Sequence, residues 1–200
     1  MALSRVSPDV AGKAHEVVTR RAIFFDRDGV LVVPEERDGR TFAVTRLEDF
    51  RLYTDTSEAL RLSHESGFLN VVVTNQPDVA SGRVTQSVVE EMHQVLCRSA
   101  IVDRVEVSYD PSGSDAPRRK PNPGMLLDAA NVLGVDTTAS FMIGDRAIDM
   151  EAGRRAGCTT VFIDRRYTND PIPTSFDHAA PSVLDAVLWC IGRSNANCYA

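Results

Sequence analysis

Long apolar runs, closely spaced cysteines and an excess of positive charge are all missing from the sequence, and each absence excludes a class of protein. A membrane-spanning helix needs roughly 20 apolar residues, and no stretch of the chain approaches that length. Residues 1–20 include Asp9, Lys13 and Glu16 but no apolar segment of the kind that signal peptides contain. We therefore expect no membrane partner.

The cysteines and the net charge bear on the compartment and the partners. Cys97, Cys158, Cys190 and Cys198 form no C-x-x-C pair, and disulfides would need an oxidising compartment. We therefore expect free thiols and a cytoplasmic protein. The formal net charge of −6 opposes non-specific nucleic-acid binding, although local Arg and Lys side chains can still bind a small phosphorylated molecule.

Length and composition predict one globular domain. The 200 residues are 43% hydrophobic, enough for one sizeable core, and no Pro-, Gly- or Ser-rich linker divides them. We place the domain at residues 21–192, between an N-terminal extension (1–20) and a C-terminal tail (193–200). The composition does not indicate an oligomeric state.

Five short apolar runs end abruptly in polar residues, a pattern typical of buried parallel strands. They cover residues 22–25, 69–73, 105–109, 141–143 and 160–163. Helical patterns follow at about residues 57–66, 85–96, 123–133, 147–156 and 183–191. Gly67, Gly134 and Gly157 stand where three of these helices would end. This alternation predicts an α/β fold with a three-layer, doubly wound parallel sheet.

Polar side chains follow three of the predicted strands. Asp26, Thr74 and Asp145 each stand at or just past a strand end, and ligands bind at the carboxyl ends of parallel strands. Asp26 and Asp28 are two residues apart, so both carboxylates can face one site. One carboxylate can attack a phosphate ester, while the other protonates the leaving oxygen and then activates water. The alternative is a plain turn, in which Asp and Gly are common.

Other segments add cations, donors and a metal ligand. Asn75 supplies an amide beside Thr74, and Lys120 can neutralise charge on a transferred phosphoryl group. Magnesium is usually held by few carboxylates, water and phosphate oxygens, which suits Asp145. Asp149 can equally be a charge favoured by a helix N-terminus. Taken alone, each feature also has a structural explanation, as a strand cap or a solvated basic pair.

In order and spacing, these segments resemble the haloacid dehalogenase (HAD) superfamily. The segments are residues 24–31 (FFDRDGVL), 73–76 (VTNQ), 119–125 (RKPNPGM) and 143–146 (IGDR) with Asp149. Within it, the chain is similar to the branch of D,D-heptose 1,7-bisphosphate and histidinol-phosphate phosphatases over about residues 21–192. The resemblance implies that Asp26 is the nucleophile and Asp28 the general acid/base. It also implies that Asp26, the main-chain carbonyl of Asp28 and Asp145 hold Mg²⁺, with Asp149 as a metal-linked carboxylate.

The same resemblance assigns further residues to the phosphoryl group and the substrate. Thr74 and Lys120 would hold the phosphoryl group, while Asn75, Arg119 and Arg146 would line the substrate site. Many members carry a cap domain, but the intervals between the segments are short, so we predict a capless enzyme. Short loops, such as residues 33–44, would then supply specificity.

Three further segments bear on the substrate, and two of them remain open in the sequence. In residues 33–44 the candidates are Glu35, Glu36, Arg37 and Arg40, with solvated surface as the alternative. Arg165-Arg166 can reach a second phosphate or be solvated. Residues 109–118, where heptose phosphatases of this branch usually bind zinc, contain neither Cys nor His, so we predict no structural zinc.

These features together predict a Mg²⁺-dependent phosphomonoesterase that works through an aspartyl phosphate. Its expected partner is a small phosphorylated molecule, a sugar phosphate such as heptose 1,7-bisphosphate. The alternatives are histidinol phosphate, a nucleotide or a nucleic-acid end as substrate, or a non-catalytic binding protein of the same fold.

Overall fold

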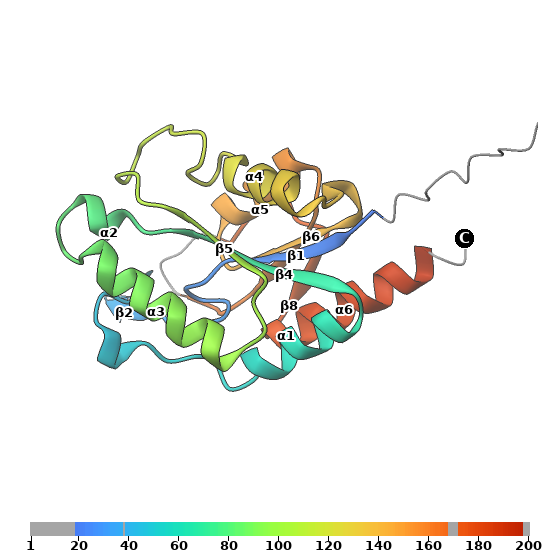
Figure 1. The fold of residues 1–200 in the computed structure, drawn as a ribbon, viewed down its shortest axis with the longest axis horizontal. Helices are drawn as coiled ribbons and strands as arrows, with labels where there is room; N and C mark the ends of the chain where they lie inside the picture. The colour runs from blue at the N-terminus through green and yellow to red at the C-terminus, as the bar shows by residue number, and fades with distance from the viewer. Residues whose placement is uncertain (1–18, 38, 168–171, 198–200) are drawn as a thin grey trace, which may run out of the picture.

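Six parallel strands form the central sheet of the computed structural model, which describes residues 19–37, 39–167 and 172–197 (Figure 1). In spatial order the strands are β5 (Arg104–Ser108), β4 (Phe68–Asn75), β1 (Arg21–Phe25), β6 (Phe141–Gly144), β7 (Thr159–Ile163) and β8 (His178–Ala180). The chain runs outward on both sides of β1, which confirms the predicted doubly wound topology.

Helices cover both faces of the sheet, as predicted for a three-layer fold (Figure 1). One face carries α1 (Thr56–Glu65), α3 (Gln86–Ser99) and α6 (Val183–Asn197). The other carries α4 (Gly124–Leu133) and α5 (Ala147–Ala156), while the short α2 (Pro77–Ala80) follows β4. Single-turn 3-10 helices span Leu47–Asp49 (η1) and Thr137–Ala139 (η2).

The strand β1 shows why an unbroken apolar run marks the centre of the sheet. Ile23 and Phe25 pack in the core on the α1, α3 and α6 side, whereas Ala22 and Phe24 pack in the core on the α4 and α5 side. Successive side chains of a strand point to opposite faces, and both faces are covered here. A buried strand of this kind therefore needs apolar residues at every position.

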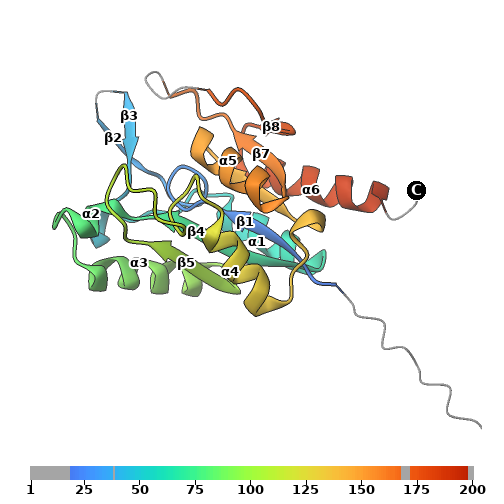
Figure 2. The ribbon, with the colours of Figure 1, turned by 90° about the horizontal axis from the view of Figure 1, so that it is seen from above.

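Several short elements are absent from the sequence prediction, among them the helices α2, η1 and η2. A two-stranded antiparallel hairpin, β2 (Glu35–Arg37) and β3 (Arg40–Phe42), occupies the segment predicted as a loop, and it projects from the body of the domain (Figure 2). The edge strand β8 is also new. The strands β2, β3 and β8 have three residues each, too few to show the alternation of apolar and polar side chains that identifies a strand.

The remaining predictions on organisation can be compared with the described residues. No cap domain lies between the strands of the described chain. Helix α6 continues to Asn197, past the predicted boundary at residue 192, and residues 1–18 of the predicted extension lie outside the described part.

Cys97, Cys158 and Cys190 are free thiols, as predicted, and Cys198 lies outside the described residues. No helix of the described chain is both long and apolar enough to cross a bilayer.

Candidate active site

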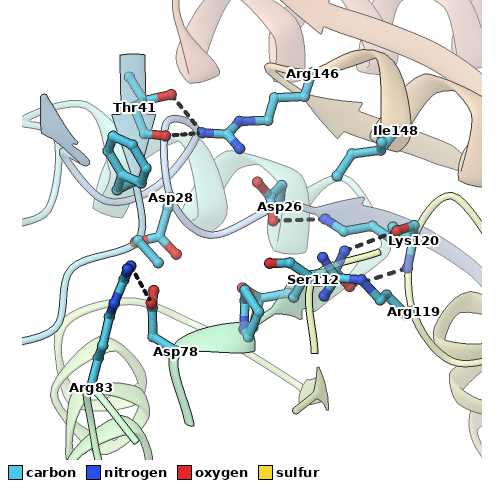
Figure 3. Close-up of a pocket in the computed structure, with 15 residues that line it drawn as sticks. Asp26, Asp28, Thr41, Asp78, Arg83, Ser112, Arg119, Lys120, Arg146 and Ile148 are labelled. Carbon is cyan, nitrogen blue, oxygen red and sulfur yellow. Dashed lines mark hydrogen bonds and ion pairs between the residues drawn. The ribbon is translucent and has the colours of Figure 1, made fainter. Parts of the chain in front are cut away.

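The pocket at the carboxyl ends of β1, β4 and β6 contains most of the predicted site residues (Figure 3). Phe25 pairs with Val72 on β4 and with Ile143 on β6, so the residues that follow these strands meet at one edge. The pocket lining includes seven predicted residues: Asp26, Asp28, Thr74, Asn75, Arg119, Lys120 and Arg146. The other two predicted residues, Asp145 and Asp149, are buried beside Asp26.

Three buried carboxylates lie close enough to share a cation. Asp26, Asp145 and Asp149 each offer one oxygen, and these oxygens lie within 4.8 Å of one another. Neither carboxylate oxygen of Asp145 has a hydrogen-bond partner among the described residues. Burial, followed by the charges of Asp26 and Asp149, raises the pKa of Asp145 well above its usual value. An unpartnered, buried acidic group of this kind fits a site for a divalent cation.

Lys120 stands at the centre of the charged groups. Its side chain is buried, and Nζ lies 2.7 Å from Asp26 Oδ1, 2.6 Å from Asp149 Oδ1 and 2.8 Å from the Val73 carbonyl oxygen. Burial alone would lower the pKa of Lys120, but the carboxylates of Asp149 and Asp26 outweigh it and raise the pKa above its ordinary value. Lys120 is therefore a cation next to the predicted nucleophile.

Asp149 takes one of the two roles that the sequence left open, the helix cap, and it also contacts Lys120. Its Oδ2 accepts a hydrogen bond from the Arg146 main-chain N–H at 3.0 Å, so it caps the first turn of α5. Its Oδ1 pairs with Lys120. Burial raises the pKa of Asp149 to about 6, although the Lys120 ammonium acts in the opposite direction. Because both oxygens have protein partners, Asp149 is better suited to orient Lys120 than to bind a metal directly.

Asn75 acts on the main chain of Lys120. Its Nδ2 donates to the Lys120 carbonyl at 3.0 Å, and its Oδ1 accepts from the Lys120 N–H at 3.1 Å. Although Asn75 lines the pocket, both ends of its amide are used to place the Lys120 backbone. This contact joins the end of β4 to the loop before α4, which are 45 residues apart.

The loop of residues 110–123 is held by hydrogen bonds. Asn122 Nδ2 donates to the Asp115 carbonyl, the Asp115 carboxylate and the Ala116 carbonyl at 3.0–3.2 Å. Arg119 Nη1 donates to the Asp110 carbonyl at 3.0 Å, and burial lowers the pKa of its guanidinium. Arg119 therefore reaches the pocket from a loop that is organised by its own polar groups.

The hairpin reaches the pocket with different residues from those predicted. Thr41, Phe42 and Ala43 line it, whereas the predicted candidates of this segment are not part of the lining: Glu35, Glu36, Arg37 and Arg40. Arg146 Nη2 donates to the carbonyl and the hydroxyl of Thr41 at 2.5 and 2.6 Å. The predicted segment therefore lines the pocket, but with uncharged side chains, and its role in specificity stays a prediction.

Arg165 is used inside the fold. Its Nε donates to the Gly29 carbonyl at 2.9 Å, and its Nη2 donates to the Val30 carbonyl at 3.3 Å. The guanidinium also lies over the Tyr53 ring, 3.7 Å from its centre. Arg166 is exposed. Neither lines the pocket at Asp26, so the two alternatives for these residues, a second phosphate or solvent, stay open.

Several residues around the site were missed in the sequence. Arg27 and Gln76 are completely buried and bind the Asp28 carboxylate. Asp78 and Arg83 form an ion pair that lines the pocket, as does Ser112. The sequence offered one signal for Arg27 and Gln76, namely that each is next to a predicted site residue in the chain. Their burial and long-range contacts cannot be inferred from spacing.

Comparison with known proteins places the chain among phosphatases. A family model described as HAD-hydrolase-like matches residues 117–187. The D-glycero-D-manno-heptose-1,7-bisphosphate 7-phosphatase of Chlorobaculum tepidum is 31% identical over 194 residues, which cover 86% of this chain and 94% of the relative. The corresponding D-glycero-beta-D-manno-heptose-1,7-bisphosphate 7-phosphatase of Escherichia coli K12 is 33% identical over 178 residues, covering 83% and 89%.

A solved structure shows the same fold. The D,D-heptose 1,7-bisphosphate phosphatase of B. bronchiseptica, complexed with magnesium and phosphate, superposes with a TM-score of 0.72 at 20% identity. The match covers 88% of this chain and 99% of that chain.

Proposed function

Because the chain belongs to the HAD-like hydrolases and is a phosphatase of that family, we propose that it is a Mg²⁺-dependent phosphomonoesterase for a sugar phosphate. The observation that carries this proposal is the buried cluster of Asp26, Asp145 and Asp149 with Lys120 against it. Few structural roles explain why a fold would place three carboxylates within 4.8 Å of one another and leave one without a partner.

Asp26, Asp145 and the Asp28 main-chain carbonyl would hold the cation. The unpartnered oxygens of Asp145 fit it, and Mg²⁺ prefers such hard oxygen ligands. When bound, Mg²⁺ would neutralise phosphate charge that otherwise repels an anionic nucleophile. Gly29 leaves room for the Asp145 carboxylate, since a Cβ there would lie 1.9 Å from Asp145 Oδ2.

The chain's own groups would carry out two steps. An oxygen of Asp26 attacks phosphorus, the bond from phosphorus to the leaving oxygen breaks, and Asp28 gives that oxygen its proton. Water then attacks the aspartyl phosphate, losing a proton to Asp28, and Asp26 is released. Lys120 and Thr74 would stabilise the charge on the phosphoryl oxygens in both steps.

The substrate proposal rests on the relatives and on the pocket's charge. Both curated relatives are named for heptose 1,7-bisphosphate, and we propose a sugar phosphate of this kind here. The lining includes four cationic side chains: Arg83, Arg119, Lys120 and Arg146. A phosphorylated sugar offers the anionic and hydroxyl groups that such side chains bind.

Replacement of the predicted nucleophile tests the reaction. Asp26→Asn should reduce Mg²⁺-dependent phosphate release at least about a thousandfold, because an amide cannot form the acyl phosphate. The substrates are heptose 1,7-bisphosphate, other sugar phosphates, histidinol phosphate, nucleotides and a phosphorylated oligonucleotide. Asp128→Asn, at an exposed carboxylate on α4, is the matched control and should keep full activity. Activity retained by Asp26→Asn would refute the mechanism, and a preference for the oligonucleotide would refute the substrate class.

A further inference from the structure

Arg27 stands between the two predicted catalytic carboxylates and binds only one of them. Its side chain is completely buried, and its guanidinium approaches Asp28 with two nitrogens. Nε and Nη2 lie 3.0 and 2.9 Å from Oδ2, and Nη2 also lies 3.2 Å from Oδ1. A two-nitrogen contact sets the plane of a carboxylate as well as its distance. Asp28 is therefore held in one orientation by a group that does not line the pocket.

His93 contacts the far side of the same guanidinium. It comes from α3, is 8% exposed, and its Nε2 lies 3.2 Å from Arg27 Nη1. An arginine has donors only, so Nε2 must accept and the ring proton must lie on Nδ1. Burial, and then the Arg27 charge, lower the pKa of His93 to about 3, in keeping with a neutral ring. The reaction described above leaves this histidine without a role.

The two oxygens of Asp28 have unequal partners. Oδ2 has close ones, since Gln76 Nε2 lies at 2.9 Å and Arg27 Nε at 3.0 Å. Oδ1 has longer contacts, with Arg27 Nη2 at 3.2 Å and the Val44 N–H at 3.3 Å. Longer hydrogen bonds are weaker, so Oδ1 is the oxygen more easily released to exchange a proton.

We propose that His93 is a positioning residue for proton transfer, because it holds Arg27 so that Oδ2 of Asp28 is anchored and Oδ1 faces the reacting oxygen. This proposal rests on the proposed function, in which Asp28 gives a proton to the leaving oxygen. Its distinctive consequence is selectivity for the leaving group. An alkyl leaving group such as a sugar needs that proton, whereas p-nitrophenolate leaves as a stable anion.

The test compares kcat/KM on p-nitrophenyl phosphate with kcat/KM on the best sugar phosphate from the substrate screen above. For both, kcat/KM covers the steps up to loss of the leaving group, so it reports formation of the aspartyl phosphate. His93→Met removes the strong acceptor and should lower kcat/KM on the sugar phosphate about tenfold or more, with a change below about twofold on the aryl ester. His93→Gln keeps an acceptor and should restore most of the loss.

Controls separate this proposal from the proposed function. Met92→Leu alters a buried side chain of the same helix and should change both substrates little. Equal losses on the two esters in His93→Met, or no loss on either, would overturn the positioning role. If His93→Met does not fold, Arg27→Lys, which keeps the charge but loses the two-nitrogen contact, must show the same selective loss or the proposal fails. Asp26→Asn reports on the proposed function alone, since it should be inactive on both esters.

Discussion

Gly29 illustrates how closely single residues are fitted at this site. It has φ +89°, and a Cβ at this position would lie 1.9 Å from Asp145 Oδ2 and 2.5 Å from its Cγ. Glycine is thus required twice, once by the backbone conformation and once by the neighbouring carboxylate. The loop after β1 and the carboxylate after β6 can approach each other only because this side chain is absent.

Gly29→Ala is expected to displace the Asp145 carboxylate and to lower Mg²⁺-dependent activity more than about tenfold. A left-handed backbone also costs an alanine about 1–2 kcal/mol of stability. Gly82→Ala separates the two effects, because Gly82 has φ +74° and a Cβ added there would meet no atom within 4 Å. Both variants should lose stability in urea titration, but only Gly29→Ala should require more Mg²⁺. Unchanged Mg²⁺ dependence in Gly29→Ala would contradict the placement of the cation at Asp145.

At the scale of elements, the segment after β7 supports the loop after β1. Arg165 donates to the carbonyls of Gly29 and Val30, which follow the predicted catalytic pair in the chain. These carbonyls are separated from Arg165 by 136 and 135 residues. The contact therefore links the segment after β7 to the loop on which Asp26 and Asp28 depend.

Arg165→Met should destabilise the protein by about 1–2 kcal/mol, because two carbonyls lose a charged donor. Arg166→Met is the matched control: it makes the same change at the neighbouring exposed residue and should stay within about 0.5 kcal/mol. Urea unfolding of both variants measures the difference. Equal stabilities would show that the Arg165 contacts contribute nothing net.

At the scale of the whole molecule, the doubly wound topology brings like charges together. Burial and the neighbouring carboxylates raise the pKa of Asp145, so the metal-free fold disfavours its ionised form. The unfolded chain ionises this group at a lower pH, and the metal-free protein therefore loses stability as pH rises from about 4 toward the raised pKa. A bound cation would remove this cost.

Added Mg²⁺ should therefore raise Tm, by the equivalent of about 2.7 kcal/mol at a hundredfold excess over Kd. Asp145→Asn should be inactive, and it should be more stable than the wild type without metal, because the buried carboxylate beside Asp26 and Asp149 is replaced by a neutral group. Thermal unfolding at neutral pH, with and without Mg²⁺, measures both. An Asp145→Asn variant that Mg²⁺ still stabilises to the same extent would place the cation elsewhere.

The sequence by itself determined the alternation of strands and helices and the residues that end the central strands. Asp26, Thr74 and Asp145 each follow an apolar run, and this pattern is local, since burial on both faces demands continuous apolar residues. The glycines at helix ends, such as Gly157 with φ +87° after α5, marked boundaries for an equally local reason. Chemical roles assigned to these residues remain predictions.

Only the tertiary structure decided which distant groups meet at the site. His93 reaches Arg27 across 66 residues, and Gln76 reaches Asp28 across 48. The hairpin β2–β3 faces the pocket with Thr41, while its charged residues lie outside the lining. Such contacts depend on the packing of whole elements, and three-residue strands are too short to show their inward face in the sequence. Spacing along a chain reports the residue types of a site, whereas distances and partners arise only when the sheet is assembled.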